Sequence, residues 1–202
     1  HFQPVINLQG DNHPVYDTFL RLDGGEGELV SPSSFLQIAE DHGMLEEIDR
    51  YVVERAIELI AQRGHAGKPV TLLIKVSQAS LQNDTLATFI GEQLELRNVS
   101  GEYLALQLQE AKVFTHLHAV QQFAAAVNSF GCRIGLEQIG AGLDSIQLLT
   151  HVQPKMLKID RSFIEELPKN PDSQNRVRDI ARKARDLDIL TIAEFVQDAA
   201  SM

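Results

Sequence analysis

Five polar residues each stand at the carboxyl end of a predicted strand. They are Lys75, Gln107, Glu137, Lys158 and Glu194. In parallel α/β folds the functional groups gather at that end of the sheet, and a barrel would bring all five to one mouth. Solvation would account for any one of them alone, but five equivalent positions favour a shared site. Two of the five are cations, which can hold a small anionic ligand.

The elements that must position these residues alternate along the chain. Period-2 or continuous apolar runs predict strands at 2–8, 15–22, 70–76, 103–108, 133–136, 156–159 and 189–193. Helical patterns cover 32–42, 45–63, 84–96, 115–130, 161–167 and 172–187. After residue 69 strands and helices take turns, which indicates a parallel sheet with crossover helices. Either an open doubly wound sheet or a (β/α) barrel follows, in a single domain over 1–202.

Composition limits the class of protein. With 202 residues, 44% of them hydrophobic, the chain can build one substantial core. Its net charge of −10 argues against non-specific DNA binding, which needs a basic face. No apolar run is long enough for a membrane helix. The lone Cys132 lies in an apolar run and is expected to be buried and inert, in a reducing, cytoplasmic setting. The chain starts at His1 without a Met, and we expect it to be a piece of a longer protein.

The glycine-rich stretch GLEQIGAGLDS (135–145) is the most conspicuous motif. Its glycines do not have the spacing of a dinucleotide-binding fingerprint, and neither a P-loop nor a G-x-S-x-G nucleophile motif is present. We therefore interpret Gly140 and Gly142 as turn residues.

Several stretches, in order, resemble EAL domains, the family of cyclic di-GMP phosphodiesterases. FQPVINL and YDTFLR are similar to its opening Q-P and E-A-L-x-R segments, and KVS (75–77) to its N-x-S. LQLQEA, GLEQIGAGLDSIQLL, PKMLKIDRSFI and IAEFVQ are similar to L-E-I-T-E-S, A-L-D-D-F-G-T-G-x-S-S-L, P-V-D-x-L-K-I-D-R-S-F-I and V-A-E-G-V-E. The resemblance implies a TIM-like (β/α) barrel that stops before the family's last strand–helix portion.

The positions that resemble the family's catalytic site are altered. The family's two-metal site uses Glu, Asn, Glu, two adjacent Asp and Glu, where this chain has Asp17, Lys75, Gln107, Glu137, Gln138 and Glu194. Lys158, the lysine that assists the attacking water, is unchanged. The resemblance therefore implies degenerate catalytic positions with no functional catalytic residue.

Charge gives an independent reason to expect no metal. The mouth has three carboxylates and two lysines, a formal charge of −1, whereas divalent ions need several anionic oxygens. A lysine about 4 Å from a divalent ion repels it by about 8 kcal/mol at an effective dielectric of about 20. We expect no Mg²⁺ cofactor and no metal-assisted hydrolysis.

Ligand binding can persist without hydrolysis. Arg21 offers a planar fork for a phosphate, and Phe19 and Phe195 offer ring faces to guanine. The resemblance adds a guanine-contacting Asp49, a loop proline at Pro154 and a weakened guanine contact at Gln197. Lys75 could neutralise a phosphate where a metal stood. The full expected binding set is Gln3, Phe19, Leu20, Arg21, Asp49, Lys75, Pro154, Lys158, Glu194, Phe195 and Gln197.

Within the family, A-E-F-V-Q and the altered positions most resemble the FimX type. This implies a metal-independent cyclic di-GMP receptor that regulates type IV pilus biogenesis and twitching motility. It also implies a PilZ-domain protein as partner, no DNA, no membrane insertion and a possible dimer. Two alternatives stay open: an interaction scaffold without nucleotide, and a weak phosphodiesterase that uses Asp17 and Glu137.

Overall fold

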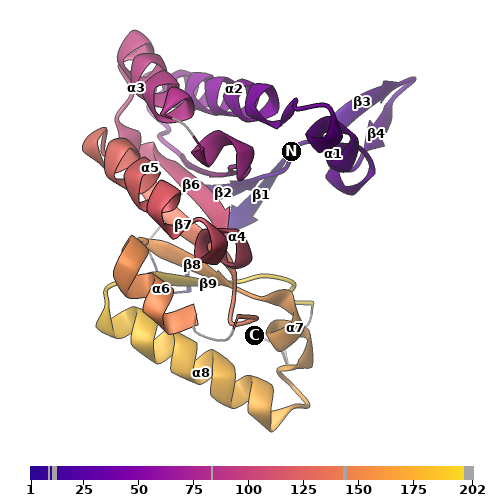
Figure 1. The fold of residues 1–202 in the computed structure, drawn as a ribbon, viewed down its shortest axis with the longest axis vertical. Coiled ribbons are helices and arrows are strands. Elements are labelled where there is room, and N and C mark those ends of the chain that lie inside the picture. Colours follow the sequence, from indigo (N-terminus) through magenta and orange to yellow (C-terminus); the bar gives the residue numbers. More distant parts are fainter. Residues whose placement is uncertain (9, 11–12, 83, 143–144, 198–202) are drawn as a thin grey trace. The chain divides into compact units, whose positions relative to one another are not determined.

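The structure, a computed structural model, describes residues 1–8, 10, 13–82, 84–142 and 145–197. The chain forms two compact units (Figure 1). Unit 1 comprises His1–Leu106 and Ala125–Cys132, and unit 2 comprises Gln107–Ala124 and Arg133–Met202. Strand β6 (Leu104–Gln109) and helix α5 (Leu117–Ser129) each contribute residues to both units.

Unit 1 is built on strands that pair side by side. β1 is antiparallel to β2, and β2 is parallel to β5. The residues of β5 from Thr71 to Ile74 are all buried, as expected for a strand covered on both faces. Helix α2 packs on β5 and on α3, and turns Val53, Ile57 and Ile60 into the core. The bounds are β1 Phe2–Val5, β2 Val15–Thr18, β3 Leu22–Gly25, β4 Glu28–Val30, α1 Pro32–Asp41, α2 Leu45–His65, β5 Thr71–Lys75, η1 Ala79–Leu81, α3 Thr85–Arg97 and η2 Gly101–Tyr103.

Unit 2 has three parallel strands, with β8 between β7 and β9. Helix α8 packs on β9 and α7, and buries Ser173, Ile180 and Ala184 along one face. It begins cleanly because the Asn170 side chain accepts hydrogen bonds from the Asp172 and Ser173 amides. The bounds are α4 Glu110–Thr115, β7 Arg133–Ile139, α6 Ser145–Val152, β8 Met156–Ile159, α7 Arg161–Glu166, α8 Pro171–Asp186 and β9 Leu190–Ala193.

The strand–helix alternation predicted after residue 69 is confirmed, and several predicted elements along the chain differ from the observed ones. The predicted strand 15–22 ends at Thr18, and a separate hairpin of β3 and β4 follows it. The predicted helix 115–130 corresponds to α5, and the short helix α4, which was not predicted, ends just before it, where His116 has a φ of −132°. Helix α6 was not predicted, because it directly follows the glycine-rich stretch. Among the described residues no helix is long and apolar enough to span a membrane.

Candidate ligand-binding site

The predicted site residues of unit 2 lie at or just beyond the carboxyl ends of its strands. Gln107 is in β6, Glu137 in β7 and Lys158 in β8, and Glu194 directly follows β9. Because β7, β8 and β9 are parallel, these ends share one edge of the sheet. Gln107, Glu137 and Lys158 are each at most 2% exposed. The sequence expectation that these polar groups share one edge is therefore realised within this unit.

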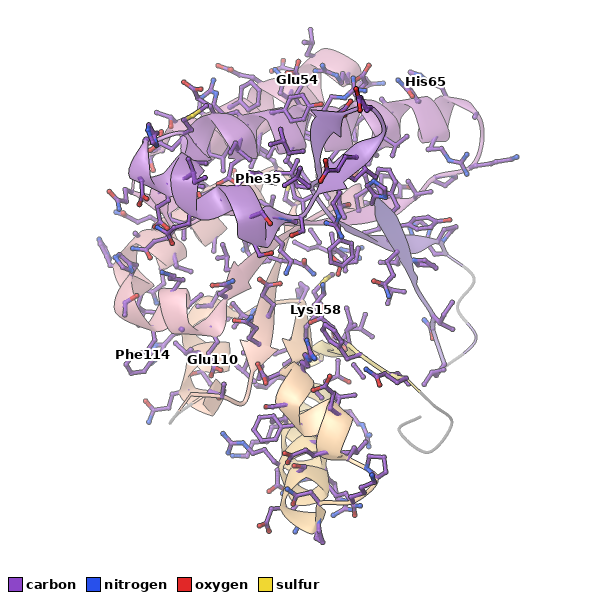
Figure 2. All side chains as sticks on the ribbon, turned by 90° about the vertical axis from the view of Figure 1, so that its right-hand side faces the viewer. Phe35, Glu54, His65, Glu110, Phe114 and Lys158 are labelled. Carbon is purple, nitrogen blue, oxygen red and sulfur yellow. The ribbon has the colours of Figure 1, made fainter. Side chains whose placement is uncertain are left out.

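Lys158 contacts two members of this group, Glu194 and Gln107; the lysine is labelled in Figure 2. Its side chain is 1% exposed, and its ammonium lies 3.1 Å from Glu194 Oε1. The same ammonium donates a hydrogen bond of 3.3 Å to Gln107 Oε1. A buried ammonium needs such partners, because removing it from water unpaired is costly. The lysine, the carboxylate and the amide together carry no net charge.

A β-bulge separates Glu137 from Gln138. Leu136 pairs with Leu157 and Ile139 with Ile159, so β7 has one more residue than β8 between these two pairs. Gln138 takes up the irregularity with a φ of 60°. Glu137 is buried while Gln138 is exposed. Bulges beside sites re-aim side chains in this way, and here the bulge directs one member of the pair to the interior and the other to solvent.

The glycine loop after β7 is held by a carboxylate that sequence reasoning missed. Glu110, 4% exposed, accepts hydrogen bonds through Oε2 from the amides of Gly140 (3.1 Å) and Gly142 (3.2 Å). A Cβ on Gly142 would stand 2.9 Å from Glu110 Oε1. Arg176 donates hydrogen bonds to the carbonyls of the same two glycines, so both the donors and the acceptors of this loop have side-chain partners. The turn interpretation of these glycines agrees with this geometry; the only sequence signal for Glu110 was an acid just after a predicted strand.

Phe195 presents an exposed ring beside the strand ends. It is 49% exposed and has a φ of 56°, a conformation that is unusual for an aromatic residue. The Arg161 guanidinium lies 4.2 Å from its ring centroid. A strained, exposed aromatic residue that is held by a cation is available for stacking on a planar ligand. Arg161 was not among the residues predicted from sequence.

In unit 1 the predicted residues lie on and after the strands. Asp17 of β2 is 5% exposed and pairs in register with Gln3 of β1, which is exposed. Lys75 ends β5 and is exposed. Arg21 donates to the Leu20 carbonyl at 2.7 Å, and its guanidinium is 5.8 Å from the Phe19 ring centroid.

Asp49 is buried and its carboxylate is hydrogen-bonded to other residues of unit 1. It is 7% exposed, and its Oδ2 accepts hydrogen bonds from the Ser77 amide (2.8 Å) and the Ser80 hydroxyl (2.7 Å). Burial raises the pKa of Asp49 above its ordinary value, although the hydrogen bonds from Ser77 and Ser80 oppose this. The carboxylate thus organises the segment that follows β5. Of the remaining predicted residues, Pro154 is buried and Gln197 is exposed.

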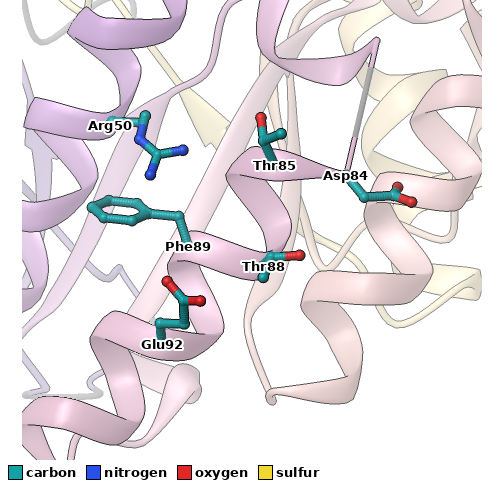
Figure 3. A pocket seen from close by; sticks show the side chains of 6 residues that line it. All are labelled: Arg50, Asp84, Thr85, Thr88, Phe89 and Glu92. Carbon is teal, nitrogen blue, oxygen red and sulfur yellow. The ribbon is translucent and has the colours of Figure 1, made fainter.

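A separate hollow of about 320 Å³ lies between α2 and α3 in unit 1 (Figure 3). The Arg50 guanidinium stacks on Phe89 there, 4.2 Å from the ring centroid. Its other lining residues are Asp84, Thr85, Thr88 and Glu92. None of the residues predicted from sequence lines this hollow, and it mixes both charges without a buried polar group.

The donor set does not fit a pair of divalent ions. Within unit 2, Gln107 and Gln138 offer uncharged amides, whereas such ions need anionic oxygens. Glu194 is already occupied by the Lys158 ammonium. Among the described residues of unit 2, no three His, Cys, Asp or Glu side chains form a group that could hold a metal ion.

Comparison with known proteins places this arrangement in a family. The model of the EAL domain family matches residues 1–202. The chain belongs to the EAL domain family. The predicted fold class, a (β/α) barrel of the EAL type, is thereby confirmed.

Two solved structures of EAL domains are similar over the whole chain. The EAL domain of Xanthomonas citri FimX in complex with c-diGMP is 47% identical, with a TM-score of 0.93 over 100% of this chain and 79% of that one. The EAL domain of Pseudomonas aeruginosa FimX bound to c-di-GMP is 31% identical, with a TM-score of 0.92 over 99% of this chain and 80% of that one. The predicted resemblance to the FimX type is confirmed.

Curated relatives include enzymes. The cyclic di-GMP phosphodiesterase PdeF of Escherichia coli is 27% identical over 97% of this chain and 26% of its own length. The chain spans about a quarter of the length of PdeF and of two other curated relatives.

Proposed function

We propose that this EAL domain is a metal-independent receptor for cyclic di-GMP that does not hydrolyse it. One observation carries the proposal: the buried Lys158 ammonium is balanced by the Glu194 carboxylate and the Gln107 amide, at 3.1 and 3.3 Å. With Gln107 neutral, this group needs no divalent ion to offset excess negative charge. The same substitution removes an anionic oxygen that a metal would require.

Ligand binding is supported by groups that do not depend on a metal. Phe195, with Arg161 on one face of its ring, has the aromatic surface that a guanine base would need. Arg21 and Lys75 supply cations for phosphate oxygens. The similarity to two FimX EAL domains bound to c-di-GMP favours the same ligand.

Calorimetric titration with cyclic di-GMP tests the proposal, with Mg²⁺ in one series and a chelator in another, followed by analysis for linear dinucleotide. We expect equal affinity in both series and no linear product. Product that forms with Mg²⁺ and disappears with the chelator would instead assign a weak phosphodiesterase. Absence of binding heat in both series, together with no melting shift, would assign a nucleotide-free scaffold.

Lys75 is proposed to neutralise a ligand phosphate. Lys75→Met should then weaken cyclic di-GMP binding, whereas Lys68→Met, which removes an exposed lysine elsewhere in unit 1, should not. Equal affinity of Lys75→Met and wild type would remove Lys75 from the site without affecting the receptor assignment.

The downstream role is proposed from the FimX resemblance. A cytoplasmic receptor of this type would act through protein contacts, with a PilZ-domain protein as partner, on type IV pilus biogenesis and twitching motility. A pull-down with the purified PilZ-domain protein, with and without cyclic di-GMP, checks the partner. A binding signal that is equal in both conditions would contradict nucleotide control of the contact.

A further inference from the structure

The hollow between α2 and α3 presents one cation and two anions to solvent. Arg50 comes from α2, and Asp84 and Glu92 come from the N-cap position and the middle of α3. Among the described residues, none of these three side chains takes part in an ion pair or a hydrogen bond. Asp84 does not cap α3 with its side chain, although aspartate is a favoured capping residue. The charges of the hollow are therefore available to a molecule from outside the chain.

An aromatic ring stands between these charges. The lining residues of α3 are three or four positions apart and so share one face of the helix: Thr85, Thr88, Phe89 and Glu92. The Arg50 guanidinium stacks on the Phe89 ring, 4.2 Å from its centroid. In Figure 3 the ring lies between this guanidinium and the Glu92 carboxylate. Stacking uses the flat face of a guanidinium and leaves its N–H groups at the edge for an anion.

The lining charges limit the class of ligand. Arg50, Asp84 and Glu92 sum to a formal −1, which favours a cation over an anion. A phosphate would meet two carboxylates, and a divalent ion would meet the arginine. The described residues also contain no group of three His, Cys, Asp or Glu side chains that could hold a metal ion. A volume of about 320 Å³ suits a small molecule. The matching ligand has a net charge of +1 and a carboxylate for Arg50.

We propose that this hollow binds a free basic amino acid, with L-arginine as the best match. Its α-carboxylate would accept hydrogen bonds from the Arg50 guanidinium. Its side-chain cation would lie on the open face of Phe89 and pair with Glu92. Both charges then belong to one molecule, at opposite ends of an apolar stem. The proposal goes beyond cyclic di-GMP binding, since no residue of the expected nucleotide-binding set lines the hollow.

The probe is L-arginine, titrated into the whole chain in low-salt buffer and followed by amide NMR and calorimetry. We expect saturable shift changes near Arg50 and near 84–92. Agmatine lacks the carboxylate and L-citrulline lacks the side-chain charge, so each should bind at least about fivefold more weakly, because each loses one ionic contact. Absence of saturable shifts with L-arginine would overturn the proposal, and so would binding of either analogue that is as tight as that of L-arginine.

Two variants assign the contacts. Arg50→Gln should weaken L-arginine binding at least about fivefold and remove its advantage over agmatine, whereas Glu92→Gln should remove its advantage over L-citrulline. The controls Arg63→Gln and Glu95→Gln remove the same charges from exposed positions of α2 and α3 outside the hollow, and each should stay within about twofold of wild type. Equal weakening in the controls would reduce the effect to overall charge and refute the site. Cyclic di-GMP is left out of these titrations, so their outcome is separate from that of the receptor test.

Discussion

Glu110 offers the sharpest test of how the glycine loop is held. Its Oε2 accepts from the amides of Gly140 and Gly142 at 3.1 and 3.2 Å. A hydrogen bond to a charged group stabilises by about 1.5–3 kcal/mol, against about 0.5–1.5 kcal/mol for a neutral one. Glu110→Gln keeps an acceptor but removes the charge, so the free energy of unfolding should fall by about 1–2 kcal/mol.

Glu110→Ala removes both hydrogen bonds, and the two glycine amides should respond differently. Gly142 is exposed, so water can replace the lost acceptor. Gly140 is buried, and its unpaired amide should cost about 1–3 kcal/mol. We expect a total loss of about 2–4 kcal/mol in Glu110→Ala, measured by urea unfolding.

Amide hydrogen exchange followed by NMR isolates the local effect. Protection of the Gly140 amide should fall by about fivefold in Glu110→Gln, and further in Glu110→Ala, since each 1.4 kcal/mol is a factor of about ten. The control is Asp179→Asn, which breaks an exposed pair with Arg182 and should change stability by less than about 0.5 kcal/mol. Unchanged protection of Gly140 in Glu110→Ala would refute the assigned role of the carboxylate.

Three further outcomes are expected. Burial raises the pKa of Asp49, so its contribution to stability is present below its ordinary pKa of 3.8 and is lost as pH rises through the raised value. The unfolding free energy of wild type relative to Asp49→Asn should therefore fall as pH rises above 3.8 in urea titrations, and a rising difference would contradict this. Phe195→Gly should weaken cyclic di-GMP binding by about 5- to 150-fold in calorimetry, because the stacking surface is lost. The free energy of unfolding should change by less than about 1 kcal/mol, because relief of the strain in the left-handed backbone offsets loss of the Arg161 contact. Glu194→Gln should lower the free energy of unfolding by about 1–3 kcal/mol, because the buried Lys158 ammonium loses its charged partner. The double variant Lys158→Met/Glu194→Gln should lose less stability than the sum of the two single variants, and strict additivity would count against direct coupling of the two residues.

Much of the fold could be predicted because its strands are short apolar runs bounded by polar residues. The predicted strand 156–159 coincides with β8, and 70–76 contains β5. The hairpin was missed because the glycines and acids of LDGGEGELV give no apolar alternation. Its antiparallel pairing depends on a turn with positive φ at Gly25, Glu26 and Gly27, and glutamate gives no sequence signal for that conformation.

The candidate site was predictable to the extent that side-chain type reveals role. The strand-end position of Lys158 made it a candidate site residue, and the structure places it in contact with Gln107 and Glu194. The role of Glu110 could not be predicted, because its partners are backbone amides of residues 30 and 32 positions away. The bulge at Glu137 was also hidden, since it is a property of strand register rather than of composition.

Gln138 has a backbone conformation that limits which residues fit at its position. Its φ of 60° is a conformation that aspartate tolerates better than most residues, and active members of the family are expected to have aspartate at this position. The backbone at this position therefore suits an aspartate as well as the glutamine that this chain has. Exchange between glutamine and aspartate at this position is therefore expected to need no rebuilding of the loop.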